Sequence, residues 1–307
     1  MTLGGWLRRA ERLYAKHGVA LGQTAALAHD EALYLILRTL GLPLDSGPSV
    51  LGRKLSAPES AEIGAVFDRR LAGRVPAAYI TREAWLGGMR FYVDERVLIP
   101  RSYFVEIIPE QAGPWLPDPA RVTRIADVCT GSGCLAILLA RHFKKARLDA
   151  IDLSADALEV AKVNVRRHKL SGRVRLLRGD LLDPAPGGRY DMILCNPPYE
   201  PTAHVDALPE EFRREPRLAL DGGPDGLALV RRLVGQSARL LKPRGVLMIE
   251  VGGGATRSTA SSATLSRTGS KPWTEATAFA SSRRRGWRRV TRGRDRRGRS
   301  PRRGSEG

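Results

Sequence analysis

The spacing of apolar residues divides the chain into a helical first part and a strand–helix second part. Between Trp6 and about Ala72, apolar residues recur every three or four positions, which predicts amphipathic helices. Two such stripes are Ala32, Leu33, Ile36, Leu37 and Leu40, and Ile63, Val66, Phe67 and Leu71. Gly41-Leu42-Pro43 ends the first of these helices, and Ser56 with Pro58 begins the second. The stripes predict a small helical core, and we find no candidate catalytic or binding residues in this part of the sequence.

A hairpin pattern follows the helical part. The run from Trp85 to Val93 predicts two short strands around the turn Gly87-Gly88. Residues 94–101 are expected to be extended because they lead into Pro100, and a residue before proline avoids the helical region. Spacing alone is equally compatible with a simple linker between domains.

From Arg124 onward, apolar runs of strand length alternate with helical patterns. The predicted strands are Ile125–Val128, Leu148–Asp152, Val174–Leu177, Tyr190–Cys195 and Val246–Val251. The predicted helices are Cys134–Ala140, one that begins after Ser154, and Leu227–Leu241. This alternation predicts an α/β fold with a parallel, doubly wound sheet, in which ligands bind at the carboxyl ends of the strands.

Composition narrows the class of protein. With 307 residues and 42% hydrophobic content, the chain can hold two domains, and no stretch approaches a membrane span. The first residues lack an apolar signal core, so we expect a cytoplasmic protein. Cys129, Cys134 and Cys195 lack metal-ligand spacing, and we interpret them as small buried thiols in a reducing compartment, with no metal site.

The net charge of +19 is unevenly distributed. Gly252 to Gly307 carries 15 Lys and Arg against 3 Asp and Glu, a net of +12, so the rest of the chain holds only +7. A mildly basic body is suited to a partner rich in RNA.

Acidic residues at strand ends point to a nucleoside site. Gly131 and Gly133 allow the backbone to approach a ligand closely, although the motif is too short for the dinucleotide fingerprint. Asp152 lies 19 residues after Gly133, close to the separation expected for an acid that holds ribose hydroxyls. Asp180, beside Leu181, is placed to accept from an adenine amine.

Four polar residues should therefore meet in one crevice. Asp127, Asp152, Asp180 and Asn196 stand at or beside the ends of successive strands. No pyrophosphate-binding lysine or Walker pattern is present, so a nucleoside without phosphates, such as S-adenosylmethionine, fits better than NAD or ATP.

The turn Asn196-Pro197-Pro198-Tyr199 ends the fourth predicted strand. Its prolines offer carbonyl acceptors and no N–H donors, while Asn196 adds a side-chain oxygen. Such a rim of acceptors suits a planar NH₂ group, in an amide or in a nucleobase, and Tyr199 supplies an aromatic wall. A rigid strand-end turn is the structural alternative.

These motifs together resemble the protein N(5)-glutamine methyltransferase family. The resemblance rests on Asp127 to Cys134, on Asn196 to Tyr199 and on Val93 to Arg101. Arg101-Ser102, the loop from Cys129 to Cys134 and Leu208 to Pro216 are most similar to the branch that acts on ribosomal protein three of the large subunit; the release-factor branch is less similar.

The resemblance implies a class I, Rossmann-like methyltransferase fold, ribosomal protein methylation and a role for each site residue. The donor S-adenosylmethionine would be lined by Asp127, Cys129, Thr130, Gly131, Ser132, Gly133, Asp152, Asp180 and Leu181. The substrate glutamine would be bound by Asn196, Pro197, Pro198 and Tyr199, of which Asn196, Pro197 and Tyr199 would serve catalysis. We expect a helical domain at 1–83, a hairpin linker at 84–101 and a methyltransferase domain at 102–251, and the charge distribution adds a basic tail at 252–307.

Two other functions compete with this one. A methyltransferase for exocyclic amines of nucleic acid uses a similar acceptor corner on a flipped base. A non-catalytic ribosome-assembly factor would use the fold to bind RNA.

The resemblance ends after Val251. Residues from Thr256 onward show no strand or helix periodicity, so we expect the last strands of the sheet to be missing or altered. If the native strands are replaced by an out-of-frame sequence, the fifth strand has an unprotected edge. One interpretation of the tail is a disordered RNA-binding arm. The favoured one is translation out of frame past about Gly252.

Overall fold

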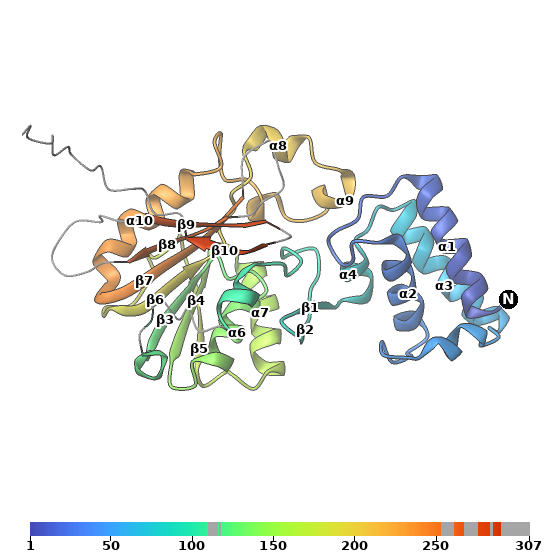
Figure 1. Ribbon diagram of the computed structural model, residues 1–307, viewed down its shortest axis with the longest axis horizontal. Coiled ribbons are helices and arrows are strands. Elements are labelled where there is room, and N and C mark those ends of the chain that lie inside the picture. Colours follow the sequence, from blue (N-terminus) through green and yellow to red (C-terminus); the bar gives the residue numbers. More distant parts are fainter. Residues whose placement is uncertain (110–115, 117, 253–260, 267–275, 283–284, 290–307) are drawn as a thin grey trace, which may run out of the picture.

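The computed structural model describes residues 1–109, 116, 118–252, 261–266, 276–282 and 285–289, the last three ranges as backbone only. It contains a group of helices at the N-terminus and a mixed sheet covered by helices (Figure 1). None of the helices in these ranges is long and apolar enough to cross a membrane.

The N-terminal helices form their own core. They are α1 (Leu3–His17), α2 (Ala28–Thr39), α3 (Ala57–Leu71) and α4 (Ala77–Thr81), with a 3₁₀ turn at Pro48–Gly52. The expected start of α3 is confirmed: Ser56 and Glu59 form a reciprocal capping box that satisfies two backbone N–H groups of the first turn. The predicted apolar stripes pack together, and a buried Arg70–Glu31 ion pair of 2.6 Å crosses this core.

The expected hairpin is present, and the segment that follows it is anchored to α7 (Ala155–Arg167). β1 (Ala84–Leu86) and β2 (Met89–Phe91) pair antiparallel around Gly87 and Gly88. The buried side chain of Asn164 accepts from the backbone N–H of Tyr92 at 2.7 Å and donates to the Tyr92 carbonyl at 2.9 Å. Residues 93–99 place three buried apolar side chains, Val93, Val97 and Ile99, against α7. This segment is therefore part of the packed structure and more than a connection.

The predicted parallel sheet is confirmed. Its parallel strands are β3 (Arg124–Val128), β4 (Arg147–Asp152), β5 (Val174–Arg178), β6 (Tyr190–Cys195) and β7 (Leu241–Val251), in the spatial order β7-β6-β3-β4-β5. The chain starts at β3, adds strands on one side and then crosses to β6 on the other. The reversal of order therefore lies between β3 and β6, which is where doubly wound sheets bind ligands.

Helices cover both faces of this sheet. They are α5 (Phe104–Ile107), α6 (Cys134–His142), α7 (Ala155–Arg167) and α10 (Ala228–Leu240), with short helices α8 (Thr202–Asp206) and α9 (Glu210–Arg213) and 3₁₀ turns at Pro119–Arg121 and Arg217–Ala219. Alternate residues of β3 show the two-sided burial: Ile125 packs with α6, while Ala126 belongs to the core that includes Leu233 of α10. Burial on both faces explains why these strands are continuous apolar runs in the sequence.

The C-terminal side of the sheet differs from the expectation. β8 (Ser261–Ser266) pairs antiparallel with β7, from Val246 opposite Ser266 to Val251 opposite Ser261, and β9 (Ala276–Ser282) and β10 (Arg285–Arg289) follow. The prediction of an unprotected β7 edge is therefore wrong. Strand pairing uses backbone N–H and C=O groups, which any proline-free run supplies even without an apolar pattern. The rest of the tail, on which the predictions of disorder and RNA binding fall, lies outside the described residues.

Candidate functional site

The loop after β3 is held by two carboxylates. Asp127 is fully buried, and its Oδ2 accepts from the Thr130 hydroxyl at 2.6 Å and from the backbone N–H of Ala136 at 3.0 Å. Asp152, at the end of β4, accepts from the Gly131 N–H at 2.8 Å and from the Ser154 N–H at 2.9 Å. Gly131 has φ +53°, a conformation that favours glycine. The two acids therefore fix the turn that connects β3 to α6.

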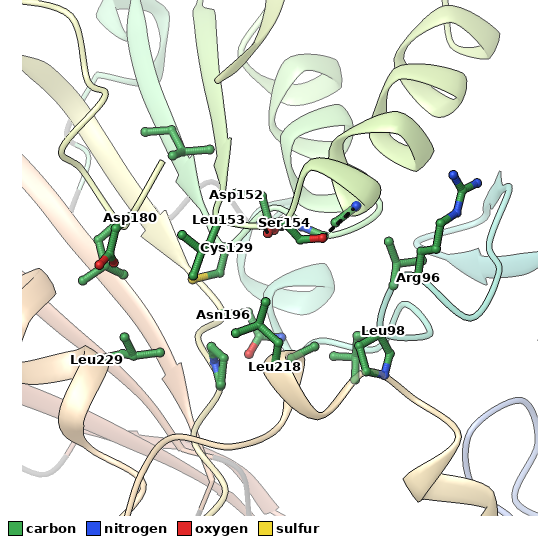
Figure 2. A pocket seen from close by; sticks show the side chains of 18 of the residues that line it. Arg96, Leu98, Cys129, Asp152, Leu153, Ser154, Asp180, Asn196, Leu218 and Leu229 are labelled. Atoms are coloured by element: carbon green, nitrogen blue, oxygen red, sulfur yellow. Dashed lines mark hydrogen bonds between the residues drawn. The ribbon is translucent and has the colours of Figure 1, made fainter. Parts of the chain in front are cut away.

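A cavity opens beyond the ends of β3, β4 and β6 (Figure 2). Asp180 and Leu229 lie toward one end of it, and Arg96 and Leu98 lie toward the other. We call it the donor cavity, and its lining residues are Arg96, Val97, Leu98, Cys129, Gly131, Ile151, Asp152, Leu153, Ser154, Ala157, Gly179, Asp180, Leu181, Asn196, Pro198, Pro216, Leu218, Ala219 and Leu229.

The chemistry of the donor cavity is apolar with two carboxylates. Burial raises the pKa of Asp152 above its usual range, although the bonds from Ser154 and Gly131 oppose this shift. One oxygen of Asp180 pairs with Arg232 at 2.7 Å. Apart from Arg96, whose guanidinium is paired with Asp94, the polar groups of the lining offer acceptors to hydroxyl and amine donors, which fits a nucleoside that carries a positive charge.

Two backbone conformations at this cavity were not visible in the sequence. Cys129 has φ +59° and Leu181 has φ +48°, both in the left-handed region that side chains other than glycine rarely adopt. Residues held this way cluster at functional sites, because the surrounding structure must impose the conformation. Both residues were predicted donor contacts, and both line the cavity.

The predicted donor residues separate into two groups. Cys129, Gly131, Asp152, Asp180 and Leu181 line the donor cavity. The other four do not line the donor cavity: Asp127, Thr130, Ser132 and Gly133.

The residues that do not line the donor cavity hold the loop between β3 and α6 in place. The carbonyl of Ser132 accepts from Asn164 at 2.9 Å, and a Cβ added to Gly133 would lie 3.2 Å from the Cβ of Ala161. We expected four strand-end groups to meet in one crevice. Asp152, Asp180 and Asn196 do so, whereas the Asp127 side chain points inward to Thr130 and Ala136.

A second cavity of about 150 Å³ adjoins the first, and we call it the acceptor cavity. It is lined by Leu98, Arg101, Asn196, Pro197, Tyr199, Glu200, Leu208, Phe212, Ala219 and Leu220. Leu98, Asn196 and Ala219 line both cavities, so the two spaces meet at the end of β6.

The predicted Asn-Pro-Pro-Tyr turn lies at this junction. Asn196 faces both cavities, Pro198 lines the donor cavity, and Pro197 and Tyr199 line the acceptor cavity. Burial raises the pKa of Tyr199 to about 12, so its phenol stays neutral at physiological pH. The following backbone is tied down by the Glu200 N–H, which donates to the Leu220 carbonyl at 2.9 Å.

Several lining residues were missed by sequence reasoning. Arg96, Val97 and Leu98 come from the segment interpreted as a linker, and Leu218 and Ala219 follow the Leu208–Pro216 segment. The only sequence signal was that both segments belong to the family resemblance. Nothing in their periodicity shows that they approach β4 and β6.

Replacing Asp127 with asparagine should remove a pH dependence of stability. Burial raises the pKa of Asp127 to about 7, and its Oδ1 has no hydrogen-bond partner among the described residues. In the unfolded chain this carboxyl ionises near pH 4, so between about pH 4 and 7 the unfolded state alone loses the proton and wild-type stability falls with rising pH. The loss amounts to about 4 kcal/mol across the window.

Urea unfolding at pH 4.5, 5.5, 6.5 and 7.5 measures this effect. We expect Asp127→Asn to gain free energy of unfolding relative to wild type as the pH rises, and to keep a constant difference above about pH 7.5. Asp156→Asn removes an exposed carboxyl of α7 and is the control. Parallel pH curves for wild type and Asp127→Asn would contradict the assignment.

Among the described residues, no group of three or more His, Cys, Asp or Glu side chains is placed to hold a metal ion.

Comparison with known proteins adds independent information. The family model of the methyltransferase small domain matches residues 114–224. The ribosomal protein uL3 glutamine methyltransferase of Burkholderia pseudomallei is 46% identical over 258 residues, which cover 82% of this chain and 84% of that protein. The protein of the same name from Bordetella pertussis is 48% identical over 251 residues, with the same coverage. Among solved structures, the hMettl16 catalytic domain bound to an RNA hairpin matches at 15% identity and a TM-score of 0.46, covering 71% of this chain and 84% of that one.

Proposed function

This chain belongs to the ribosomal protein uL3 glutamine methyltransferase family, and on that premise we propose that it methylates the side-chain amide nitrogen of a glutamine in uL3, with S-adenosylmethionine as methyl donor. The family membership confirms the class I methyltransferase fold and the enzyme class expected from the sequence.

The observation that carries the proposal is the meeting of the two cavities at Asn196. One cavity has the carboxylates and apolar walls suited to a nucleoside, and the other has the acceptors suited to a carboxamide. A methyl transfer needs its two reactants in line and nearly in contact, and well-oriented groups lower such barriers by roughly 7–11 kcal/mol. Adjoining cavities that share Asn196 supply that arrangement.

The acceptor side binds and orients the amide. The glutamine NH₂ has two hydrogens, which the side-chain oxygen of Asn196 and the carbonyl of Pro197 accept, while the ring of Tyr199 limits rotation of the amide plane. An amide nitrogen is a weak nucleophile because its lone pair is delocalised. During methyl transfer positive charge would grow on the amide nitrogen, and the oxygens of Asn196 and Pro197 would stabilise it until the proton passes to solvent water.

The donor side holds the nucleoside. When bound, S-adenosylmethionine supplies a methyl carbon made electrophilic by its sulfonium. Asp152 would accept from the ribose hydroxyls, because a carboxylate has about four acceptor sites and the backbone N–H groups of Gly131, Ser154 and Leu153 do not fill them all. Asp180 and Leu181 would border the adenine, and Cys129 and Gly131 would line the methionine part.

Labelled methyl transfer tests the proposal. The full chain is incubated with radiolabelled S-adenosylmethionine and, in separate reactions, with uL3, peptide chain release factor or ribosomal RNA. We expect label on uL3 and a 14-dalton increase on one glutamine by mass spectrometry. Label on release factor alone or on nucleic acid alone would replace the substrate assignment, and absence of donor binding by calorimetry would favour a non-catalytic binding factor.

A further inference from the structure

The segment after the acceptor turn, which includes α9, lies next to the N-terminal helices (Figure 1), and it carries two buried carboxylates. Glu211 accepts from the Ala20 N–H at 3.2 Å and from Arg74 at 2.8 Å. Glu215, one helical turn later, accepts from the amide of Gln23 at 2.6 Å. The segment that carries Phe212 on the acceptor cavity is therefore attached to the helical domain at two points.

Glu215 also organises the acceptor cavity itself. Its side chain is inaccessible to solvent, and it accepts from the Ile99 N–H at 3.0 Å and from Nη1 of Arg101 at 2.9 Å. The Arg101 guanidinium lies 5.8 Å from the centre of the Phe212 ring. Glu211 has no such contact with Arg101, although it crosses the same domain boundary.

Arg101 still has donors to offer. Within the described part of the chain, Nη1 is bonded to Glu215 and to the Ile99 carbonyl, whereas Nε and Nη2 have no partner. The Arg101 side chain is about one-third exposed and lines the acceptor cavity, where it is the single cation among the described lining residues.

A primary carboxamide needs both kinds of partner. The acceptors at Asn196 and Pro197 satisfy its NH₂ group, but its oxygen requires a donor once the side chain leaves water. Apart from Arg101, Asn196 and Tyr199, the cavity lining consists of aliphatic and aromatic side chains, a proline and the carboxylate of Glu200. A donor on the oxygen also decides which end of the carboxamide faces the methyl group, because it distinguishes oxygen from nitrogen.

We propose that Arg101 binds the oxygen of the substrate carboxamide and that Glu215 is the positioning residue that holds Arg101 for this task. The inference rests on the proposed function. It also gives the connection between α1 and α2 a part in positioning Arg101, because Gln23 of that connection is the third group on the Glu215 carboxylate.

Steady-state kinetics with uL3 and donor binding by calorimetry test the assignment. We expect Arg101→Met to lower kcat/KM for uL3 about 10- to 100-fold, the loss typical of a hydrogen bond to a charged group, with less than a two-fold change in the dissociation constant of S-adenosylmethionine. Arg101→Lys keeps a cationic donor and should recover part of this loss. Glu215→Gln should lose about 3- to 10-fold, because it keeps an acceptor for Ile99 but no ion pair.

Glu211→Gln is the matched control, since it weakens the same domain boundary without touching Arg101. Equal losses in Glu211→Gln and Glu215→Gln would reduce Glu215 to a structural contact and overturn its positioning role. An Arg101→Met enzyme within two-fold of wild type would overturn the carboxamide contact, and a larger loss in Tyr199→Phe than in Arg101→Met would move that contact to the phenol. Wild-type activity on uL3 separates these outcomes from failure of the proposed function: if wild type transfers no methyl to glutamine, the function itself is wrong.

Discussion

Replacing Asn196 with alanine is expected to lower kcat for methyl transfer by at least about 100-fold. The variant loses the side-chain acceptor at the point where the donor and acceptor cavities meet. Removing one preorganised group that stabilises charge in a transition state typically costs about 10²- to 10³-fold in kcat. Donor binding should change little, because the carboxylates of Asp152 and Asp180 remain in place.

Single-turnover kinetics with labelled donor, together with calorimetry, separate the two effects. Asn196→Asp keeps an acceptor oxygen on the same short tether and should lose less activity than Asn196→Ala. Equal losses of donor affinity and of transfer rate in Asn196→Ala would show that Asn196 acts mainly in the donor cavity and that the division of roles is wrong.

Replacing Asp152 with alanine is expected to raise the dissociation constant of S-adenosylmethionine about 10- to 100-fold. The variant loses the carboxylate proposed to accept from ribose, and hydrogen bonds to charged groups are worth about 1.5–3 kcal/mol. It also leaves the Gly131 and Ser154 N–H groups without their acceptor, which loosens the turn after β3. Both losses act on the donor side.

Isothermal titration with S-adenosylmethionine measures this constant directly. Asp152→Asn retains one acceptor oxygen and should fall between wild type and Asp152→Ala. The KM for uL3, measured at saturating donor, should stay within about three-fold of wild type. A dissociation constant unchanged in Asp152→Ala would remove Asp152 from the ribose site.

Local sequence signals were sufficient for the elements of the catalytic domain. β6 runs from Tyr190 to Cys195 as expected, and Ser154 caps α7 as expected. The apolar period of a strand or a helix and the identity of a capping residue depend on only a few neighbouring positions, so they can be recognised in the sequence without knowledge of the fold. β7 begins at Leu241 rather than Val246, because Leu241 pairs with Tyr190 across an irregularity that only the neighbouring strand imposes.

The sequence by itself determined the parallel sheet, its strand-end acids and the acceptor turn, because in a parallel sheet successive strands end at the same edge. Only the tertiary structure decided that Asp127 turns inward, that residues 96–98 line the donor cavity with Leu98 also lining the acceptor cavity, and that Glu215 joins Gln23 to Arg101. The contacts of Glu215 connect residues more than 100 positions apart in the chain, and the burial of this carboxylate requires them. A carboxylate removed from solvent must find its donors wherever the fold brings them.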